Sequence, residues 1–81
     1  MPLYMDVHDA KGLTDEKVAA IHKKDLAAQG KHGVKFVKYW FDQDKGKVFC
    51  LSQAPNPEAT LAVHKETGAP TNEIYQVHEG S

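Results

Sequence analysis

The sequence predicts an α+β domain in which one four-stranded antiparallel sheet carries two helices on one face. Read along the 81 residues, the hydrophobic pattern gives the order strand, helix, strand, strand, helix, strand,. The two middle strands are separated by a short turn and therefore form a hairpin. The split βαβ arrangement, known as the ferredoxin-like fold, joins these elements into one sheet with the usual handedness of connections.

The first two elements have clear local signals. Residues 3–8 alternate between the two sides of an extended chain, as expected of a half-buried strand,. Thr14 is suited to cap a helix whose first turn is acidic, which the helix dipole favours,. This helix runs to about Gln29, with Gly30 as its stop. Its buried side is marked by Val18, Ile21 and Leu26,.

The hairpin is the strongest signal in the chain. Its arms, residues 34–42 and 47–53, are rich in aromatic and β-branched residues and contain the only Trp and the only Cys,. A two- or four-residue loop pairs Tyr39 with Cys50, whereas a three-residue loop pairs Tyr39 with Leu51. We prefer the first register because it resembles the common four-residue hairpin with Gly at its end.

The last two elements follow the hairpin. Asn56 caps a second helix, and Pro57 occupies its first position, where a missing N–H costs nothing,. This helix spans about residues 57–67, and Gly68 ends it. Residues 73–77 form the last strand.

The preferred register assigns side chains to the two faces of the sheet. We expect one set to face the helices: Leu3, Met5, Val7, Phe49 and Leu51. A second set shares the open face: Tyr4, Asp6, His8, Val37, Tyr39, Phe41, Val48, Cys50 and Ser52. An open face this apolar predicts a homodimer packed through the open faces of two sheets, with Cys50 and His8 in or beside the interface.

Size and charge exclude several classes of protein. A chain of 81 residues makes a single domain, residues 1–81,. Its 10 basic and 11 acidic residues give a net charge of −1, which argues against a nucleic-acid surface,. We see no membrane span and no signal peptide. One Cys cannot form an internal disulfide, so we expect a cytoplasmic protein,.

Four residues are candidate metal ligands, namely His8, His22, Cys50 and His64. A thiolate with imidazoles suits a late first-row divalent metal such as nickel, copper or zinc, although no finger-type spacing is present. The alternative is that Cys50 is a small buried hydrophobe and that the histidines are satisfied core residues. His32 and His78 are interpreted as surface residues.

Asp25 has two interpretations. It lies three residues after His22 on one helical face, which would let its carboxylate orient that imidazole,. Alternatively, it is a salt-bridge partner of Lys24 or Lys65.

The chain resembles a family of small bacterial ferredoxin-like proteins, formerly a domain of unknown function and described as nickel-binding. The matching segments, in order along nearly the whole chain, are Met5–His8, Ala20–Leu26, Tyr39–Asp42, Gly46–Leu51, Ala54–Pro55 with Glu58–Ala59, Val63–His64, and Glu73–Ile74 with Val77. The resemblance implies the ferredoxin-like fold, a dimer, and binding of a divalent metal, nickel. His8, His22, Cys50 and His64 match the family pattern, and their roles as ligands are our inference.

Functions from three different classes follow. The leading interpretation is a small cytoplasmic homodimeric protein that binds nickel for sequestration or handling and is not an enzyme. The alternative is a small-molecule enzyme of the dimeric α+β barrel type, monooxygenase- or isomerase-like, with a pocket of ~300 Å³ or more between sheet and helices. A Cys50–His8 nucleophilic pair would be another enzymatic arrangement. A structural interaction module is the third option.

Overall fold

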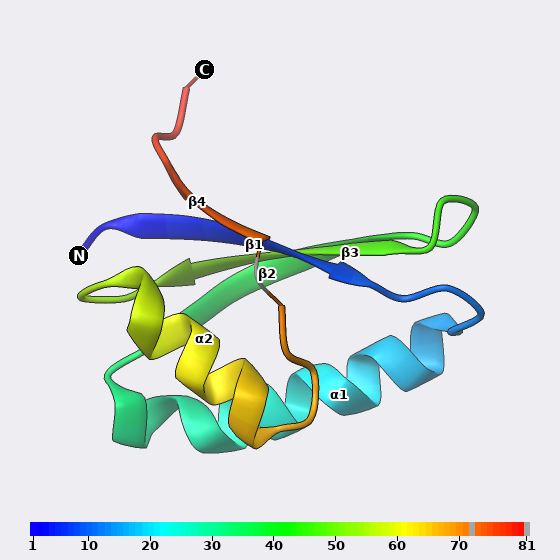
Figure 1. Cartoon of the computed structure of the whole chain (residues 1–81), viewed down its shortest axis with the longest axis horizontal. Coiled ribbons are helices and arrows are strands. Elements are labelled where there is room, and N and C mark those ends of the chain that lie inside the picture. Colours follow the sequence, from blue (N-terminus) through cyan, green and yellow to red (C-terminus); the bar gives the residue numbers. More distant parts are fainter. Residues whose placement is uncertain (72, 81) are drawn as a thin grey trace.

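The computed structural model describes residues 1–71 and 73–80, so that Asn72 and Ser81 of the predicted domain lie outside the described residues. Its elements, in chain order, are β1 (Leu3–Asp9), α1 (Asp15–Ala28), the 3₁₀ helix η1 (Gln29–His32), β2 (Lys35–Asp42), β3 (Lys47–Gln53), α2 (Pro57–Glu66) and β4 (Glu73–Val77). The strands form one antiparallel sheet in the order β2-β3-β1-β4, and both helices lie on the same side of it (Figure 1). The predicted ferredoxin-like fold is confirmed.

The hairpin adopts the preferred register, in which Tyr39 pairs with Cys50. Gly46 ends its loop with a left-handed φ of 66°, and a Cβ at this position would lie 2.9 Å from the Cα of Lys11. The carbonyl of Gly46 also accepts a hydrogen bond of 2.8 Å from the Ala10 amide. The tip of the hairpin is therefore tied to the loop that follows β1, and only glycine fits this contact.

Both predicted helix caps are present, but α1 ends differently from the prediction. The Thr14 hydroxyl accepts from the Lys17 amide, and the Asn56 side chain accepts from the Ala59 amide. Gly30 does not stop the helix, because η1 carries the chain one more turn to Gly33, which has a left-handed φ of 69°.

The two faces of the sheet are the reverse of those predicted. The side chains that point towards the helices are Tyr4, Asp6, Val48, Cys50 and Ser52, none of them more than 7% exposed. Leu3, Met5, Val7, Phe49 and Leu51 alternate with them and lie on the open face. Side chains that alternate strictly along a strand leave two choices for the face of the sheet that the helices cover. Here polar contacts determine which face that is. The Ser52 hydroxyl meets Thr60 of α2 at 3.0 Å, so its burial leaves no unpaired group,.

A β-bulge changes the face of one more residue. The pairing of β2 with β3 shifts between Phe36 and Lys38, so that Phe36 is buried while Val37 is 44% exposed,. Val37 was predicted to share a face with Cys50, and this is wrong. Tyr39 and Phe41 do lie on the Cys50 side, where they pack beside Val18 and Val48.

The buried side of α1 also differs by one position from the prediction. Leu26 is 40% exposed, whereas its neighbour Asp25 is only 2% exposed. Val18 is buried as expected. Near its end the helix thus turns the Asp25 carboxylate towards the interior in place of Leu26, and this carboxylate needs a partner there.

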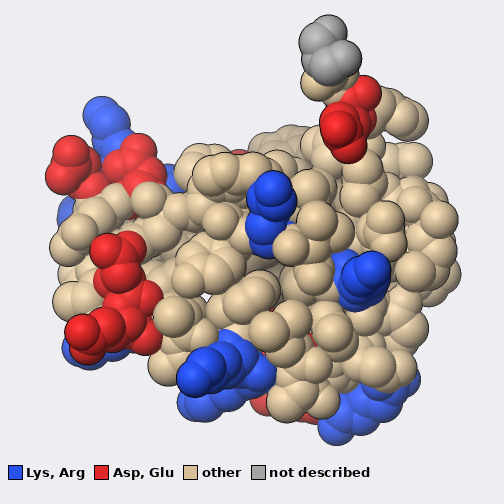
Figure 2. Space-filling view, turned by 180° about the vertical axis from the view of Figure 1, so that it is seen from behind, with Lys and Arg blue, Asp and Glu red and all other residues tan. Residues whose placement is uncertain are grey.

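The surface carries no continuous basic region on the face drawn in Figure 2, where lysines stand apart on a broad uncharged area. Carboxylates gather at one end of that view. Among the described residues, no helix is long and apolar enough to cross a membrane.

Candidate metal centre

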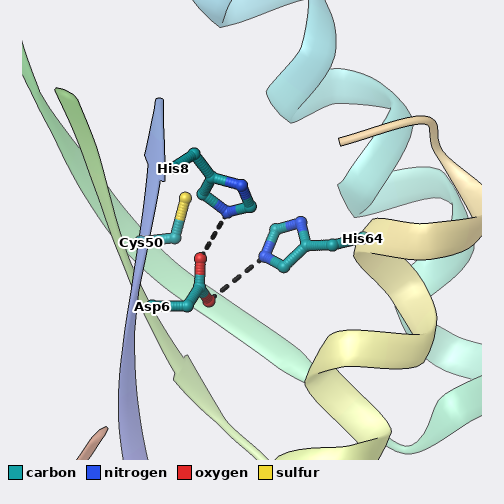
Figure 3. A group of neighbouring side chains, drawn as sticks. All are labelled: Asp6, His8, Cys50 and His64. Carbon is teal, nitrogen blue, oxygen red and sulfur yellow. Dashed lines mark hydrogen bonds and ion pairs between the residues drawn. The ribbon is translucent and has the colours of Figure 1, made fainter. Parts of the chain in front are cut away.

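Three elements bring four metal-ligating side chains together between the sheet and the helices. Asp6 and His8 come from β1, Cys50 from the facing position on β3, and His64 from α2, which reaches towards the sheet (Figure 3). One ligand atom from each residue lies within 4.8 Å of all the others. The group therefore has the compactness of a metal site, although its members come from three separate parts of the sequence.

Asp6 holds two imidazoles at once. Its Oδ1 accepts from His8 Nε2 at 2.5 Å and its Oδ2 accepts from His64 Nε2 at 3.1 Å (Figure 3). Burial opposes ionisation of this fully buried carboxyl, but the hydrogen bonds from His64 and His8 outweigh it and hold the pKa of Asp6 below its ordinary value,. The Asp6 carboxylate thus sets the positions of both imidazole rings, which meet edge to face at 4.3 Å between centroids.

A second carboxylate lies behind His64. Asp25 Oδ1 is 3.4 Å from His64 Nδ1, within ion-pair distance, and accepts a 2.6 Å hydrogen bond from the Thr67 hydroxyl. Burial disfavours the charged form of His64, but the contacts with Asp25 and Asp6 outweigh it and raise the pKa of His64 to about 9. This is the arrangement in which a carboxylate orients a metal-binding histidine through its far nitrogen. Asp25 was expected to orient His22 or to pair with a lysine; its closest polar contacts are His64 and Thr67.

The donor set fits a late first-row divalent cation. Imidazole, thiolate and carboxylate are the ligand types that such ions accept, and bonds of about 2.0–2.3 Å place any two donors at most about 4.6 Å apart. The observed limit of 4.8 Å therefore requires only a small adjustment of side chains. The buried Nδ1 of His8 has no hydrogen-bond partner among the described residues, and an unpaired buried nitrogen of this kind is what an ion would satisfy,.

Cys50 is held as a thiol in the metal-free protein. Burial, together with the charges of Asp6 and Asp25, raises its pKa far above the ordinary value,. A catalytic cysteine needs the opposite shift, so this environment argues against a Cys50–His8 nucleophilic pair. It suits a ligand that gives up its proton only when a cation arrives.

A cavity of about 210 Å³ adjoins the four donors. His8, Cys50 and His64 line it, as does His22, which lies in its wall against the Tyr39 ring at 4.7 Å between centroids. The cavity lies between sheet and helices, where the enzyme interpretation requires one, but is smaller than the ~300 Å³ expected there.

The structure thus brings three of the four predicted ligands together and adds one that was not predicted. His8, Cys50 and His64 form the group with Asp6, while His22 stands nearby in the cavity wall. Asp6 shares a strand face with His8 and pairs directly with Cys50, and that juxtaposition was the signal that could have identified it. His32 contacts Glu66 at the surface and His78 is exposed.

A ferredoxin-like domain with two imidazoles, a thiol and a carboxylate converging in its interior defines the class of small candidate transition-metal-binding proteins. Comparison with known proteins is more specific. The chain belongs to the family of nickel responsive SCO4226-like proteins, whose model matches residues 4–77. This confirms the family expected from the sequence.

The similarity to a solved structure extends over nearly the whole chain. The crystal structure of SCO4226 from Streptomyces coelicolor A3(2) superposes with a TM-score of 0.92 at 34% sequence identity, over 98% of this chain and 99% of that one. Among the curated proteins there is no match.

Proposed function

We propose that this protein binds one nickel ion per chain through Asp6, His8, Cys50 and His64, and that it serves to sequester or handle the metal. The observation that carries the proposal is the convergence of the four donors in the interior of a chain of the nickel responsive family. The ion would take the place of the protons now held by Cys50 and His64, so that its binding releases protons. Cys50 must stay reduced for this role, and the location we propose is the cytoplasm.

We further propose that the protein is a homodimer formed through the open face of the sheet. The support is an apolar surface that the helices leave uncovered, made of Leu3, Met5, Val7, Trp40, Phe49, Leu51, Tyr75 and Val77,. Cys50 and His8 point to the other side of the sheet, so each subunit of such a dimer keeps its metal site to itself.

Calorimetric titration with nickel tests the metal proposal. We expect one site per chain in the wild-type protein, and a loss of affinity greater than about a hundredfold in Cys50→Ala, since removing a ligand costs more than removing its supporting group. Two histidine variants form a matched pair. His8→Ala should weaken nickel binding, and His32→Ala should not, because His32 lies outside the donor group and its side chain pairs with Glu66 at the surface.

Two results would contradict the proposal. Unchanged affinity in Cys50→Ala would remove the thiol from the site. Failure of the wild-type protein to take up nickel, copper or zinc would end the metal-binding assignment altogether. Circular dichroism of each metal-free variant distinguishes loss of a ligand from loss of the fold.

A further inference from the structure

The cavity beside the four donors is larger than an ion needs. Its volume is about 210 Å³, whereas a water molecule takes roughly 30 Å³ of liquid and an aliphatic cavity of about 150 Å³ accepts a benzene ring,. Three of the four donor residues, His8, Cys50 and His64, form part of its wall. A metal held by the cluster would therefore lie beside a space that fits a small organic molecule.

The lining of the cavity is mainly apolar. Leu13, Val18, Ile21 and Val48 contribute to it, next to polar residues that include three of the donors. His22, another polar residue of the wall, adds a buried Nδ1 that has no hydrogen-bond partner within the described part of the chain. The space therefore suits a ligand with an apolar body and a polar end directed at the metal.

The net charge of the metal-loaded site determines which kind of polar group a ligand can direct at the metal. Asp6 and a Cys50 thiolate together balance a divalent cation, and Asp25 adds a third negative charge 3.4 Å from His64. The loaded site is therefore already negative in a region where charges are poorly screened. A carboxylate or phosphate ligand would add to that charge, whereas a neutral nitrogen donor would not.

We propose that the cavity binds a small neutral nitrogen heterocycle, of the imidazole class, which completes the coordination of the bound metal. The ring would rest against the apolar wall, and its second nitrogen would find the unpaired His22 side chain in the same cavity. This inference rests on the proposed nickel site. It makes the protein a receptor for a metal together with an organic ligand.

The test uses the full chain loaded with one nickel ion and freed of excess metal. The probes are 4-methylimidazole and butyrate, which have equal numbers of non-hydrogen atoms but differ in charge. Calorimetry reports binding, and the nickel–thiolate absorption band reports whether the metal environment changes. We expect 4-methylimidazole to bind and shift the band without abolishing it, and butyrate to do neither.

Two tryptophan variants on the same helix provide the matched control. Ile21→Trp fills the cavity and should weaken 4-methylimidazole binding by about tenfold or more while nickel stays bound,. Leu26→Trp lies on the exposed side of α1 and should leave 4-methylimidazole binding unchanged. If Ile21→Trp fails to fold, Leu13→Phe fills the same space from the loop before α1.

The outcomes separate this inference from the nickel site itself. Nickel uptake without 4-methylimidazole binding would overturn the inference alone and leave the cavity as an entry path for the ion. Loss of the absorption band on adding the probe would show that it strips the metal, which also overturns the inference. Equal binding of butyrate would refute the charge argument, and absence of nickel uptake would overturn both proposals.

Discussion

At the proposed nickel site we expect Asp25 to support metal binding without touching the ion, and the substitution Asp25→Asn tests this. The substitution keeps the size of the side chain and an oxygen that can accept from the Thr67 hydroxyl, but removes the charge 3.4 Å from His64 Nδ1. Losing a carboxylate behind a metal-binding histidine typically weakens metal affinity by about 10–100-fold. We expect a loss of about tenfold, or roughly 1.4 kcal/mol of binding free energy.

The pH of the measurement matters because Asp25 also favours the competing proton on His64. The pKa of His64 is raised to about 9, so at neutral pH the metal must displace a proton that Asp25 helps to hold. At neutral pH, Asp25 therefore favours both the metal on His64 and the proton that competes with it, and these two effects partly cancel. We therefore expect the loss caused by Asp25→Asn to be small near pH 7 and to reach its full size above about pH 9, which competition with a nickel chelator measures.

A double-mutant cycle with His64→Gln identifies the route of the effect. If Asp25 acts through His64, Asp25→Asn should cause almost no further loss of nickel affinity in the His64→Gln background. Asp15→Asn, in the exposed first turn of the same helix, is the control for removing a charge from α1. An equal loss in both backgrounds, or a loss that does not change with pH, would refute the reasoning.

Three further predictions concern the fold, the assembly and the charge network. Gly46→Ala should lower the free energy of unfolding by about 2 kcal/mol, because φ is positive and the new Cβ meets Lys11,. Gly30→Ala is the control, since open space surrounds Gly30, and it should not lower this free energy as much. Equal urea midpoints for the two variants would contradict this prediction. Trp40→Glu should shift sedimentation from dimer to monomer and Leu26→Glu should not; a dimer that survives Trp40→Glu would count against the open-face interface. The folded-state pKa of His64 lies above its ordinary value of 6.5, so its contribution to the stability of the metal-free protein is complete below pH 6.5 and is lost as pH rises through about 9,. Urea unfolding should show this fall in the wild type and not in His64→Gln, and a flat profile in both would disprove it.

The sequence predicts the order of elements and the hairpin register well, because those depend on local signals. Aromatic and β-branched arms with a four-residue turn determine that Tyr39 pairs with Cys50, and the caps at Thr14 and Asn56 determine where the helices begin. These signals involve residues close together in the chain. They are therefore visible without knowledge of the three-dimensional structure.

The choice of face could not be predicted in the same way. Both faces of β1 and β3 carry apolar residues, and alternation alone does not say which one turns inwards. Asp6 is buried because His64, 58 residues away, pairs with it, and Ser52 because Thr60 does. A carboxylate without a known partner is expected at the surface, and for this reason the sequence did not identify Asp6 as a candidate ligand.

The structure brings three of the four candidate ligands together for a related reason. His8, Cys50 and His64 were selected by the chemistry of their side chains, which does not depend on the face of the sheet. Their predicted placement on the open face of the sheet did depend on that choice of face and was wrong. His22 projects from α1 into the cavity wall, and its distance from the four donors depends on how α1 and α2 pack, which no local pattern encodes.

The donors are divided between the two layers of the domain, three on the sheet and His64 on α2. An ion held by all four would link α2 to the sheet, and the domain could not unfold without releasing the ion. At a free nickel concentration of about 100 times the dissociation constant, this adds roughly 2.7 kcal/mol to stability, which lowers the unfolded population about a hundredfold. Since proteases remove unfolded chains, empty copies would be degraded sooner than loaded ones, and the cellular amount of the protein would follow the supply of metal.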